Sequence, residues 1–468
     1  FFFFFFFFFF FFISFQIQTS TQTQITLPLI PTIRPPSPDD PLQTLTHLAS
    51  QSISRAHHLK HPVVNDVTLN HHHSASLVTV KAPLYPRGYG AHSVPLSFGT
   101  PPQPSSFVMD TGSSLVWLPC TSRYLCSGCS TTTSSSSSSV HAFIPRNSSS
   151  AKLIGCANPK CAWLFGSDIL SKCPSPKQAT EACPPYFIQY GLGSTSGLLL
   201  SETLSFKGEA GYFPDFLVGC SVVSSHQPDG IAGFGRSSES LPSQLKLQRF
   251  SYCLVSHKYD DVPRSSELVL GGSEAAAGLS YTPFRPNPNA SNSAFKDYYY
   301  VNLRRIIVGE KVIKVPHVYA VPGQDGNGGT IVDSGSTFTF MEKPLFDLVE
   351  AEFRRQLGNY TAAKDVEDRT GLKPCFRISG EPVSLPGMVL RFKGGASMEL
   401  PLSNYVALLS SDAACLIFVT DDGGKAGPAA RGGPSVILGN YQQMNYYVEY
   451  DLEKQRFGFK RQNCLSST

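Results

Sequence analysis

The chain carries little charge, and after its N-terminal stretch it has no long apolar run. Charged residues make up 15% of its 468 residues, and the formal net charge is +4. Lysines and arginines are scattered rather than clustered, which does not fit a nucleic-acid-binding surface. No later run approaches the roughly 18 apolar residues of a membrane span, and no apolar C-terminal tail suggests a lipid anchor. We therefore expect no nucleic-acid partner and no stable membrane insertion.

The motifs of two common hydrolase classes are also missing. No His-Glu-X-X-His of the zinc proteases occurs. The serines of Gly193-Ser194-Thr195-Ser196-Gly197 are misplaced for the nucleophile elbow of a serine hydrolase. Cys126-Ser127-Gly128-Cys129 could belong to a zinc knuckle or a redox site, but matching ligands at zinc spacing are absent, so disulfides are favoured. We expect no metal and no cofactor.

The sequence does contain one acidic motif twice. An apolar run leads into Asp110-Thr111-Gly112-Ser113, and another leads into Asp333-Ser334-Gly335-Ser336. Each copy predicts a buried strand that delivers a carboxylate to a tight turn, where glycine avoids a Cβ clash. A buried carboxylate needs hydrogen-bond donors or a shared charge, and the flanking hydroxyls are the natural donors.

A second motif is also repeated, and each copy follows one of the acidic motifs. Ile231-Ala232-Gly233 ends 123 residues after Asp110, and Ile437-Leu438-Gly439 ends 106 residues after Asp333. This double repeat predicts two homologous lobes, and from about residue 84 to 464 the sequence resembles the pepsin-like aspartic proteases. The resemblance implies an all-β, bilobal fold with two β-rich lobes flanking a central cleft. Two Asp-capped turns without chemistry are the less favoured alternative.

The resemblance implies that Asp110 and Asp333 form a catalytic dyad. Two unit charges about 4 Å apart at an effective dielectric of about 20 repel by about 4 kcal/mol, so one proton is shared; this family is the standard example of that effect. A water held between the carboxylates would attack the peptide carbonyl at acidic pH. Dyad support is expected from six residues: Thr111, Gly112, Ser113, Ser334, Gly335 and Ser336. The expected partner is a peptide or protein substrate, pepstatin should inhibit, and a monomer is expected.

A glycine- and serine-rich tip between two apolar runs predicts a hairpin over residues 186–200. In the family it resembles the flap that folds over the substrate, with Tyr190 as the flap tyrosine and Trp117 as its hydrogen-bond partner. Gly191, Gly193 and Ser194 would then also contact substrate. A plain surface hairpin with a core tyrosine is the alternative.

The remaining regions are assigned by composition and by the same resemblance. We expect a signal peptide over 1–18, which has no initiator Met and could be truncated, and a prosegment over 19–82. The N-terminal lobe would span 83–284, with a Cys-rich insertion at 120–183, and the C-terminal lobe 285–468. Seven of the twelve histidines lie at or before His73, which fits a pH sensor, adventitious metal binding or a solvated linker.

Twelve cysteines and three Asn-X-Ser/Thr sequons, at Asn147, Asn289 and Asn359, indicate an oxidising, glycosylating compartment. We therefore expect secretion, to the cell exterior or wall, or to the vacuole. The cysteine-rich insertion resembles the plant nepenthesin-type branch of the family. That resemblance implies six disulfides: Cys120 with Cys126, Cys129 with Cys220, Cys156 with Cys183, Cys161 with Cys173, Cys253 with Cys464, and Cys375 with Cys415.

Together these features predict an aspartic endopeptidase that hydrolyses peptide bonds at acidic pH. The rival hypothesis is a catalytically silent protein of the same fold that binds or inhibits a partner. Both Asp-hydroxyl-Gly triplets and Tyr190 are present, so the enzyme is favoured.

Overall fold

The computed structural model describes residues 24–25, 41–61, 79–86, 90–129, 142–173, 181–191, 193–206, 211–226, 229–256, 266–272, 275–288, 293–378, 384–409, 413–421 and 432–465. The expected signal peptide, His71–His73 and the sequon at Asn289 lie outside these residues. Asn147 and Asn359 are both exposed. None of the helices within the described ranges is long and apolar enough to cross a membrane.

The first lobe is built from strands between residues 92 and 233. They are β3 (His92–Phe98), β4 (Gln103–Asp110), β5 (Trp117–Pro119), β6 (Leu125–Ser127), β7 (Lys152–Leu153), β8 (Tyr186–Gln189), β9 (Ser194–Ser205), β10 (Tyr212–Ser225) and β11 (Gly230–Gly233). Their main path runs β3-β4-β11-β5-β10-β9-β7. The helices of this part are α2 (Pro159–Phe165), α3 (Ser167–Lys172) and α4 (Leu241–Gln244), with a 3-10 turn at Pro145–Asn147.

The second lobe contains three smaller sheets, ordered β15-β18-β26-β19-β25, β17-β16-β21-β22 and β20-β24-β23. Their strands are β15 (Tyr299–Val301), β16 (Leu303–Val308), β17 (Lys311–Lys314), β18 (Thr330–Val332), β19 (Thr339–Met341), β20 (Cys375–Arg377), β21 (Met388–Phe392), β22 (Ser397–Leu400), β23 (Val406–Leu409), β24 (Ala413–Leu416), β25 (Phe418–Val419) and β26 (Val436–Leu438). The helices are α5 (His317–Ala320), α6 (Lys343–Gln356), α7 (Lys364–Thr370) and α8 (Asn440–Gln443), with 3-10 turns at Ser293–Lys296 and Leu402–Asn404.

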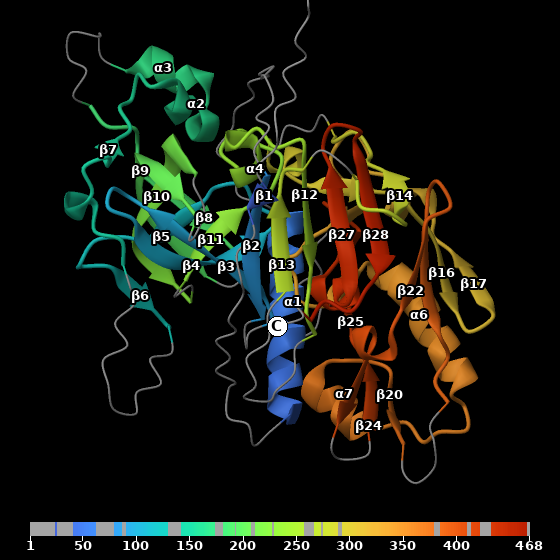
Figure 1. Ribbon diagram of the computed structural model, residues 1–468. Coiled ribbons are helices and arrows are strands. Elements are labelled where there is room, and N and C mark those ends of the chain that lie inside the picture. Colours follow the sequence, from blue (N-terminus) through green and yellow to red (C-terminus); the bar gives the residue numbers. More distant parts are fainter. Residues whose placement is uncertain are drawn as a thin grey trace, which may run out of the picture.

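A third group of strands joins the two lobes in the order β14-β28-β27-β12-β13-β2, continuing into β3. These strands are β2 (Thr79–Pro86), β12 (Arg249–Cys253), β13 (Ser266–Leu270), β14 (Ser280–Pro283), β27 (Tyr446–Asp451) and β28 (Arg456–Arg461), and β1 (Gln24–Ile25) pairs with β2. Figure 1 shows this group between the cyan and green first lobe and the orange second lobe. The boundary expected at residues 82 and 83 falls inside β2, which pairs with β13.

The repeat seen in the sequence has a counterpart in the strand pairing. In the first lobe β11 runs parallel to β4, with Gly233 opposite Asp110, and antiparallel to β5. In the second lobe β26 runs parallel to β18, with Leu438 opposite Val332, and antiparallel to β19. Each apolar-apolar-Gly segment is therefore the neighbour of its own aspartate strand, which makes the two lobes equivalent around the aspartates.

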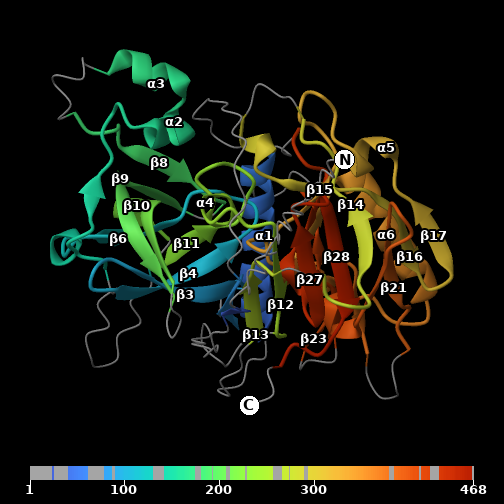
Figure 2. The ribbon, with the colours of Figure 1, turned by 45° about the horizontal axis from the view of Figure 1, so that its top comes forward.

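Helix α1 (Pro41–Lys60) lies between the lobes, as Figures 1 and 2 both show. The helix runs for 20 residues. Its buried apolar residues follow the period of an amphipathic helix; they are Leu45, Leu48, Ala49, Ala56 and Leu59. This stripe packs into the main hydrophobic core with residues of both lobes.

Two disulfides pair as the resemblance implied, Cys253 with Cys464 and Cys375 with Cys415. The pairing expected at the start of the insertion is wrong: the structure joins Cys120 to Cys220 and Cys126 to Cys129. Because β5 runs parallel to β10, its end brings Cys120 to Cys220, with 5.0 Å between their Cα atoms. Cys126 is on β6, which pairs with β10 farther along, so that Cys126 lies opposite Ser224. A short turn after β6 brings Cys129 within reach of Cys126.

The pairing expected later in the insertion is also wrong, because the structure joins Cys156 to Cys173 and Cys161 to Cys183. Backbone hydrogen bonds place Cys156 opposite Glu181, so Cys183 is two residues out of register with it. Cys161 lies on the buried side of α2 and faces Cys183, and the end of α3 carries Cys173 back to Cys156. Each new pair has a Cα separation of 5.7 Å, within the range that a disulfide spans.

Candidate active site

The two motif aspartates lie at the ends of equivalent buried strands. β4 ends at Asp110, and Asp333 directly follows β18. Their residues are 1% and 0% exposed. Both strands consist of apolar residues near these ends, so neither carboxylate can rely on bulk water, and each must be satisfied by neighbouring groups.

The same hydrogen bonds surround each carboxylate. The Ser113 hydroxyl donates to Oδ2 of Asp110 at 2.5 Å, and the Ser336 hydroxyl donates to Oδ2 of Asp333 at 2.6 Å. The backbone amides of Gly112 and Gly335 donate to the Oδ1 atoms, each at 3.0 Å. These are the donors that the sequence placed beside each aspartate, and together they fix the plane of each carboxylate.

Thr111 and Ser334 tie the two motifs together across the lobe interface. The amide of Thr111 donates to the Ser334 hydroxyl at 3.1 Å, and the amide of Ser334 donates to the Thr111 hydroxyl at 2.9 Å. Each hydroxyl in turn donates to a carbonyl of the opposite strand, at Val332 or Met109. Four hydrogen bonds therefore hold the two motifs in register with each other across the interface.

The glycines of the motifs are needed because the opposite carboxylate comes so close. A Cβ at Gly112 would lie 2.6 Å from Oδ1 of Asp333, and a Cβ at Gly335 would lie 2.3 Å from Oδ1 of Asp110. Both distances are below van der Waals contact. Any larger residue at either position would push the two carboxylates apart.

Burial raises the pKa of Asp110 to about 6; the negative charge of Asp333 adds to this rise, and the Arg55 guanidinium opposes it. Burial acts in the same direction on Asp333, but Arg55 and the Ser336 hydroxyl outweigh it and lower the pKa of that carboxyl. The pair therefore carries one proton over a wide acidic range, on the Asp110 side while Arg55 is in place.

Arg55 of α1 occupies the space between the two carboxylates. Its Nη2 lies 2.6 Å from Oδ1 of Asp110, and its Nε lies 3.1 Å from Oδ2 of Asp333. The side chain is 10% exposed. A buried guanidinium needs such partners, and the two carboxylates raise its pKa above the usual value despite the burial. While α1 is docked, the Arg55 guanidinium therefore fills the space between the two carboxylates.

Other polar groups of α1 also bind the second lobe. His57 Nε2 lies 2.6 Å from Oδ2 of Asp421, and Lys60 forms an ion pair with Glu342. The Ser52 hydroxyl accepts from the amide of Phe338 at 3.0 Å. Tyr298 donates its hydroxyl to the carbonyl of Leu59 at 3.1 Å. Charged and polar contacts thus anchor the second half of the helix, around its apolar stripe.

The predicted hairpin forms, with β8 and β9 paired from Tyr186 opposite Gly197 to Gln189 opposite Ser194. Trp117 Nε1 donates to the Tyr190 hydroxyl at 2.8 Å, as expected from the resemblance. A Cβ at Gly191 would lie 2.3 Å from the Cα of Arg55, so the tip rests directly on α1. Gly193 has a φ of +98° and meets the Ser225 carbonyl. The hairpin therefore covers the face of α1 that carries Arg55.

The sequence-based interpretation missed Arg55, Lys60, Glu342 and Asp421. One signal was available: the helical period of Leu45 and Leu48, continued along the chain, places Arg55 on the same stripe as Ser52 and Leu59, where a cation needs a buried partner. Glu342 and Asp421 pair with Lys60 and His57. They follow β19 and β25 and belong to no recognisable sequence motif. Within the described ranges, no group of three or more His, Cys, Asp or Glu side chains is placed to hold a metal ion.

Comparison with known proteins agrees with this geometry. The chain is 32% identical to a probable aspartyl protease of Arabidopsis thaliana over 422 residues, which cover 80% of this chain and 82% of that relative. The chain belongs to the pepsin-like aspartic protease family. Another relative, the aspartic proteinase nepenthesin-1 of Nepenthes gracilis, is 31% identical over 389 residues, covering 81% of this chain and 79% of the relative.

This aspartic protease homologue also matches family models and solved structures. Residues 92–272 match a model described as "Xylanase inhibitor N-terminal", and residues 298–461 match "Xylanase inhibitor C-terminal". The structure of edgp has a TM-score of 0.62 at 18% identity, covering 82% of this chain and 95% of that one. Basic 7S globulin from soybean has a TM-score of 0.60 at 17% identity, covering 83% and 98%. These likenesses confirm the predicted all-β, bilobal fold.

Proposed function

We propose that the protein is an aspartic endopeptidase made as a latent precursor, with α1 as its inhibitory segment. The observation that carries the proposal is the buried Asp110–Asp333 pair, in which equivalent hydrogen bonds hold both carboxylates and one proton is retained. Such a pair supplies a general acid and a general base at one place. Arg55 supports the second part of the proposal, because it neutralises the pair and fills the space that a reacting water needs.

With α1 withdrawn, the Arg55 position would be taken by a water between the two carboxylates. The ionised carboxylate accepts a proton from this water as the water oxygen attacks the peptide carbonyl, and the protonated carboxyl donates its proton to the carbonyl oxygen. The tetrahedral diol then collapses, with proton transfer to the leaving amine. The Thr111–Ser334 brace would hold the carboxylates in place through these steps, and the Tyr190 hairpin would close over the peptide in place of α1.

Acid would favour withdrawal of α1. Docking lowers the pKa of Asp333, so it stabilises the ionised form and weakens as the pH falls toward that lowered value. The prosegment, its release at low pH and secretion of the protein all belong to this proposal.

The test is cleavage of acid-denatured globin by the acid-treated full chain between pH 3 and 7, with and without pepstatin. Asp110→Asn and Asp333→Asn should each abolish cleavage, since the acid and base functions typically contribute about 10²–10⁴-fold. Asp347→Asn is the matched control, because that carboxylate is half exposed and forms a surface ion pair with Lys343. Cleavage that survives either dyad substitution would overturn the mechanism.

A binding protein of the same fold is the second candidate. The observation that favours it is the match to family models whose description is that of xylanase inhibitors. A chain that folds cooperatively, releases α1 and still cleaves nothing would support this candidate. The open cleft would then be a binding surface.

A further inference from the structure

A row of cations crosses the exposed face of the sheet formed by β17, β16, β21 and β22. Arg305 lies opposite Lys314 on one side and opposite Arg391 on the other, and Arg391 lies opposite Ser397. All three cationic residues are exposed, whereas their strand neighbours Ile306 and Ile313 are buried. Alternation in the strands therefore directs the three cations to the same, outer face of the sheet.

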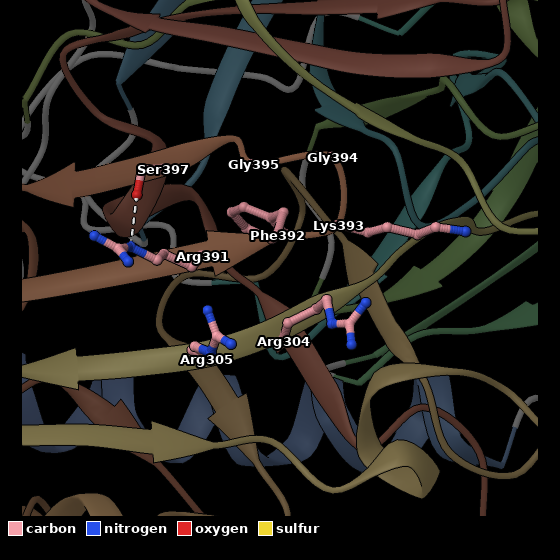
Figure 3. Close-up of a pocket in the computed structure, with 8 residues that line it drawn as sticks. All are labelled: Arg304, Arg305, Arg391, Phe392, Lys393, Gly394, Gly395 and Ser397. Carbon is pink, nitrogen blue, oxygen red and sulfur yellow. Dashed lines mark hydrogen bonds between the residues drawn. The ribbon is translucent and has the colours of Figure 1, made fainter.

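The row borders a hollow of about 480 Å³, which Figure 3 shows. Arg304, at an irregularity in β16, and Lys393, at the end of β21, add two more exposed cations to its lining. In the described part of the chain none of these five cations has an ion pair with a carboxylate. Arg391 donates instead to the Ser397 hydroxyl at 3.2 Å. The exposed Glu399 lies on the same face, opposite Val389 in the next row.

This arrangement is costly for the folded protein by itself. Like charges directly opposite one another on neighbouring strands destabilise a sheet. Here two such pairs, Lys314 with Arg305 and Arg305 with Arg391, stand side by side. An anionic ligand on this face would remove the repulsion, so the cost of the row would be offset only when the ligand is bound.

An apolar row runs beside the cationic one. Ile307 lies opposite Val312 and opposite Val389. Val312 is 45% exposed, and the other two side chains are partly exposed. The outer face thus offers a line of charges next to a line of aliphatic groups. A chain of sugar rings with one acidic group on each ring offers complementary groups, because its C–H faces are apolar and an acidic group recurs at every ring.

We propose that this face binds a linear acidic polysaccharide through Lys314, Arg305 and Arg391. Neighbouring strands lie about 4.7–4.9 Å apart, so the three cations recur at about 5 Å over about 10 Å, a spacing that suits one carboxylate or sulfate on each successive sugar. A DNA duplex presents a row of phosphates to such a face and brings no apolar edge to the second row. Figures 1 and 2 place β16 and β17 at the outer side of the second lobe, away from α1, so binding does not require an open cleft.

The experiment measures binding of the full chain to polygalacturonate, a carboxylated polymer, and to heparin, a sulfated one, at low and at high salt. The wild type should bind both at low salt and release them at high salt. Arg305→Gln/Arg391→Gln should weaken binding to both at least tenfold. Arg123→Gln/Arg146→Gln is the matched control, because it removes the same charge from two exposed arginines of the first lobe, and it should bind like the wild type.

Thermal unfolding checks that Arg305→Gln/Arg391→Gln, the row variant, is folded, and it adds an independent readout. The row variant should melt no lower than the wild type, since it loses a repulsion. Polygalacturonate should raise the melting temperature of the wild type and of the control, but not that of the row variant. If both double variants lose polysaccharide affinity to the same extent, then binding depends on net charge alone and the proposal is overturned. Duplex DNA that binds as tightly as polygalacturonate would overturn the choice of polysaccharide.

Discussion

Within the described residues, the dyad can be compared with a second carboxylate pair, formed by the buried Glu239 and the half-buried Asp297. The two pairs differ in what offsets the free-energy cost of burying a carboxylate. In the dyad, Arg55 lies against both carboxylates, and the pKa is raised to about 6 at Asp110 but lowered at Asp333. In the second pair, burial raises the pKa of Glu239 to about 8, helped by the charge of Asp297, and burial raises the pKa of Asp297 to about 6. Asp297 accepts a hydrogen bond from the Ser237 hydroxyl.

The compensating group is a cation in the dyad and bound protons in the second pair. A cation lets one dyad carboxylate stay ionised, whereas in the second pair Asp297 holds its proton up to about pH 6 and Glu239 holds its proton up to about pH 8. The dyad's cation comes from a helix that docks between the lobes, so it can in principle be removed. The protons of the second pair leave only as the pH rises. We therefore expect the dyad to respond to α1 and the second pair to respond to pH.

The largest effect is expected from Glu239→Gln, which removes the titrating group of the second pair. Above its ordinary pKa of 4.5 the unfolded chain loses the Glu239 proton, whereas the folded chain keeps it up to about 8. The folded state therefore binds more protons in this window, and its stability falls as the pH rises, by about 2–4 kcal/mol in total. Urea unfolding between pH 4.5 and 8 should show this slope in the wild type and a flatter profile in the variant.

The partner substitution separates burial from the charge of the neighbour. Asp297→Asn removes the charge that helps to raise the Glu239 pKa but leaves the burial, so the slope should persist over a narrower pH range. Asp347→Asn, at an exposed carboxylate, should leave the profile unchanged. A wild-type stability that rises from pH 4.5 to 8 would contradict this account of the second pair.

The next effect is expected from Arg55→Gln, which removes the cation of the dyad. The variant keeps a neutral hydrogen-bonding side chain but loses the charge that favours docking of α1. Cleavage of a short fluorogenic peptide by the intact, uncleaved chain should rise by about 5–150-fold, the usual range for coupling between a regulatory and a functional site. Arg55→Lys should keep most of the latency.

Arg369→Gln serves as the control for Arg55→Gln. Arg369 is an exposed residue of α7, next to α1, where only its backbone carbonyl accepts from Thr46. This variant should remain as latent as the wild type. If Arg55→Gln is equally latent, then the apolar stripe of α1 alone blocks the cleft and Arg55 has no part in inhibition.

The sequence was sufficient to predict the equivalent halves of the site. Repeats of an apolar run, an aspartate and a later apolar-apolar-Gly segment encode strands whose pairing is local to each lobe, so Asp110 and Asp333 could be recognised with their hydroxyl donors. The Trp117–Tyr190 bond could also be anticipated from the resemblance. The prediction succeeded wherever the motif and its structural neighbours lie in one repeated unit.

What the sequence could not supply is the contact between units. Arg55 meets the dyad only because α1 docks between the lobes, and no spacing in the chain encodes that docking. The four disulfides that were predicted wrongly failed for the same reason. For example, Cys120 reaches Cys220 through the register of β5 on β10, and Cys126 then pairs with the nearby Cys129. Connections set by register or docking need the assembled fold.

The smallest effect, and the sharpest test of the asymmetry between the two aspartates, comes from their serines. In the intact chain Ser336 donates to the ionised Asp333, and Ser113 donates to an Asp110 that holds the proton. Hydrogen bonds to charged groups are about twice as strong as neutral ones, so at pH 5 Ser336→Ala should lower the free energy of unfolding by about 1.5–3 kcal/mol and Ser113→Ala by about 0.5–1.5 kcal/mol. In the activated enzyme, where Arg55 is gone and the two aspartates share the proton, the two substitutions should reduce kcat by similar factors. Equal destabilisation of the intact chain would show that Arg55 does not set the asymmetry.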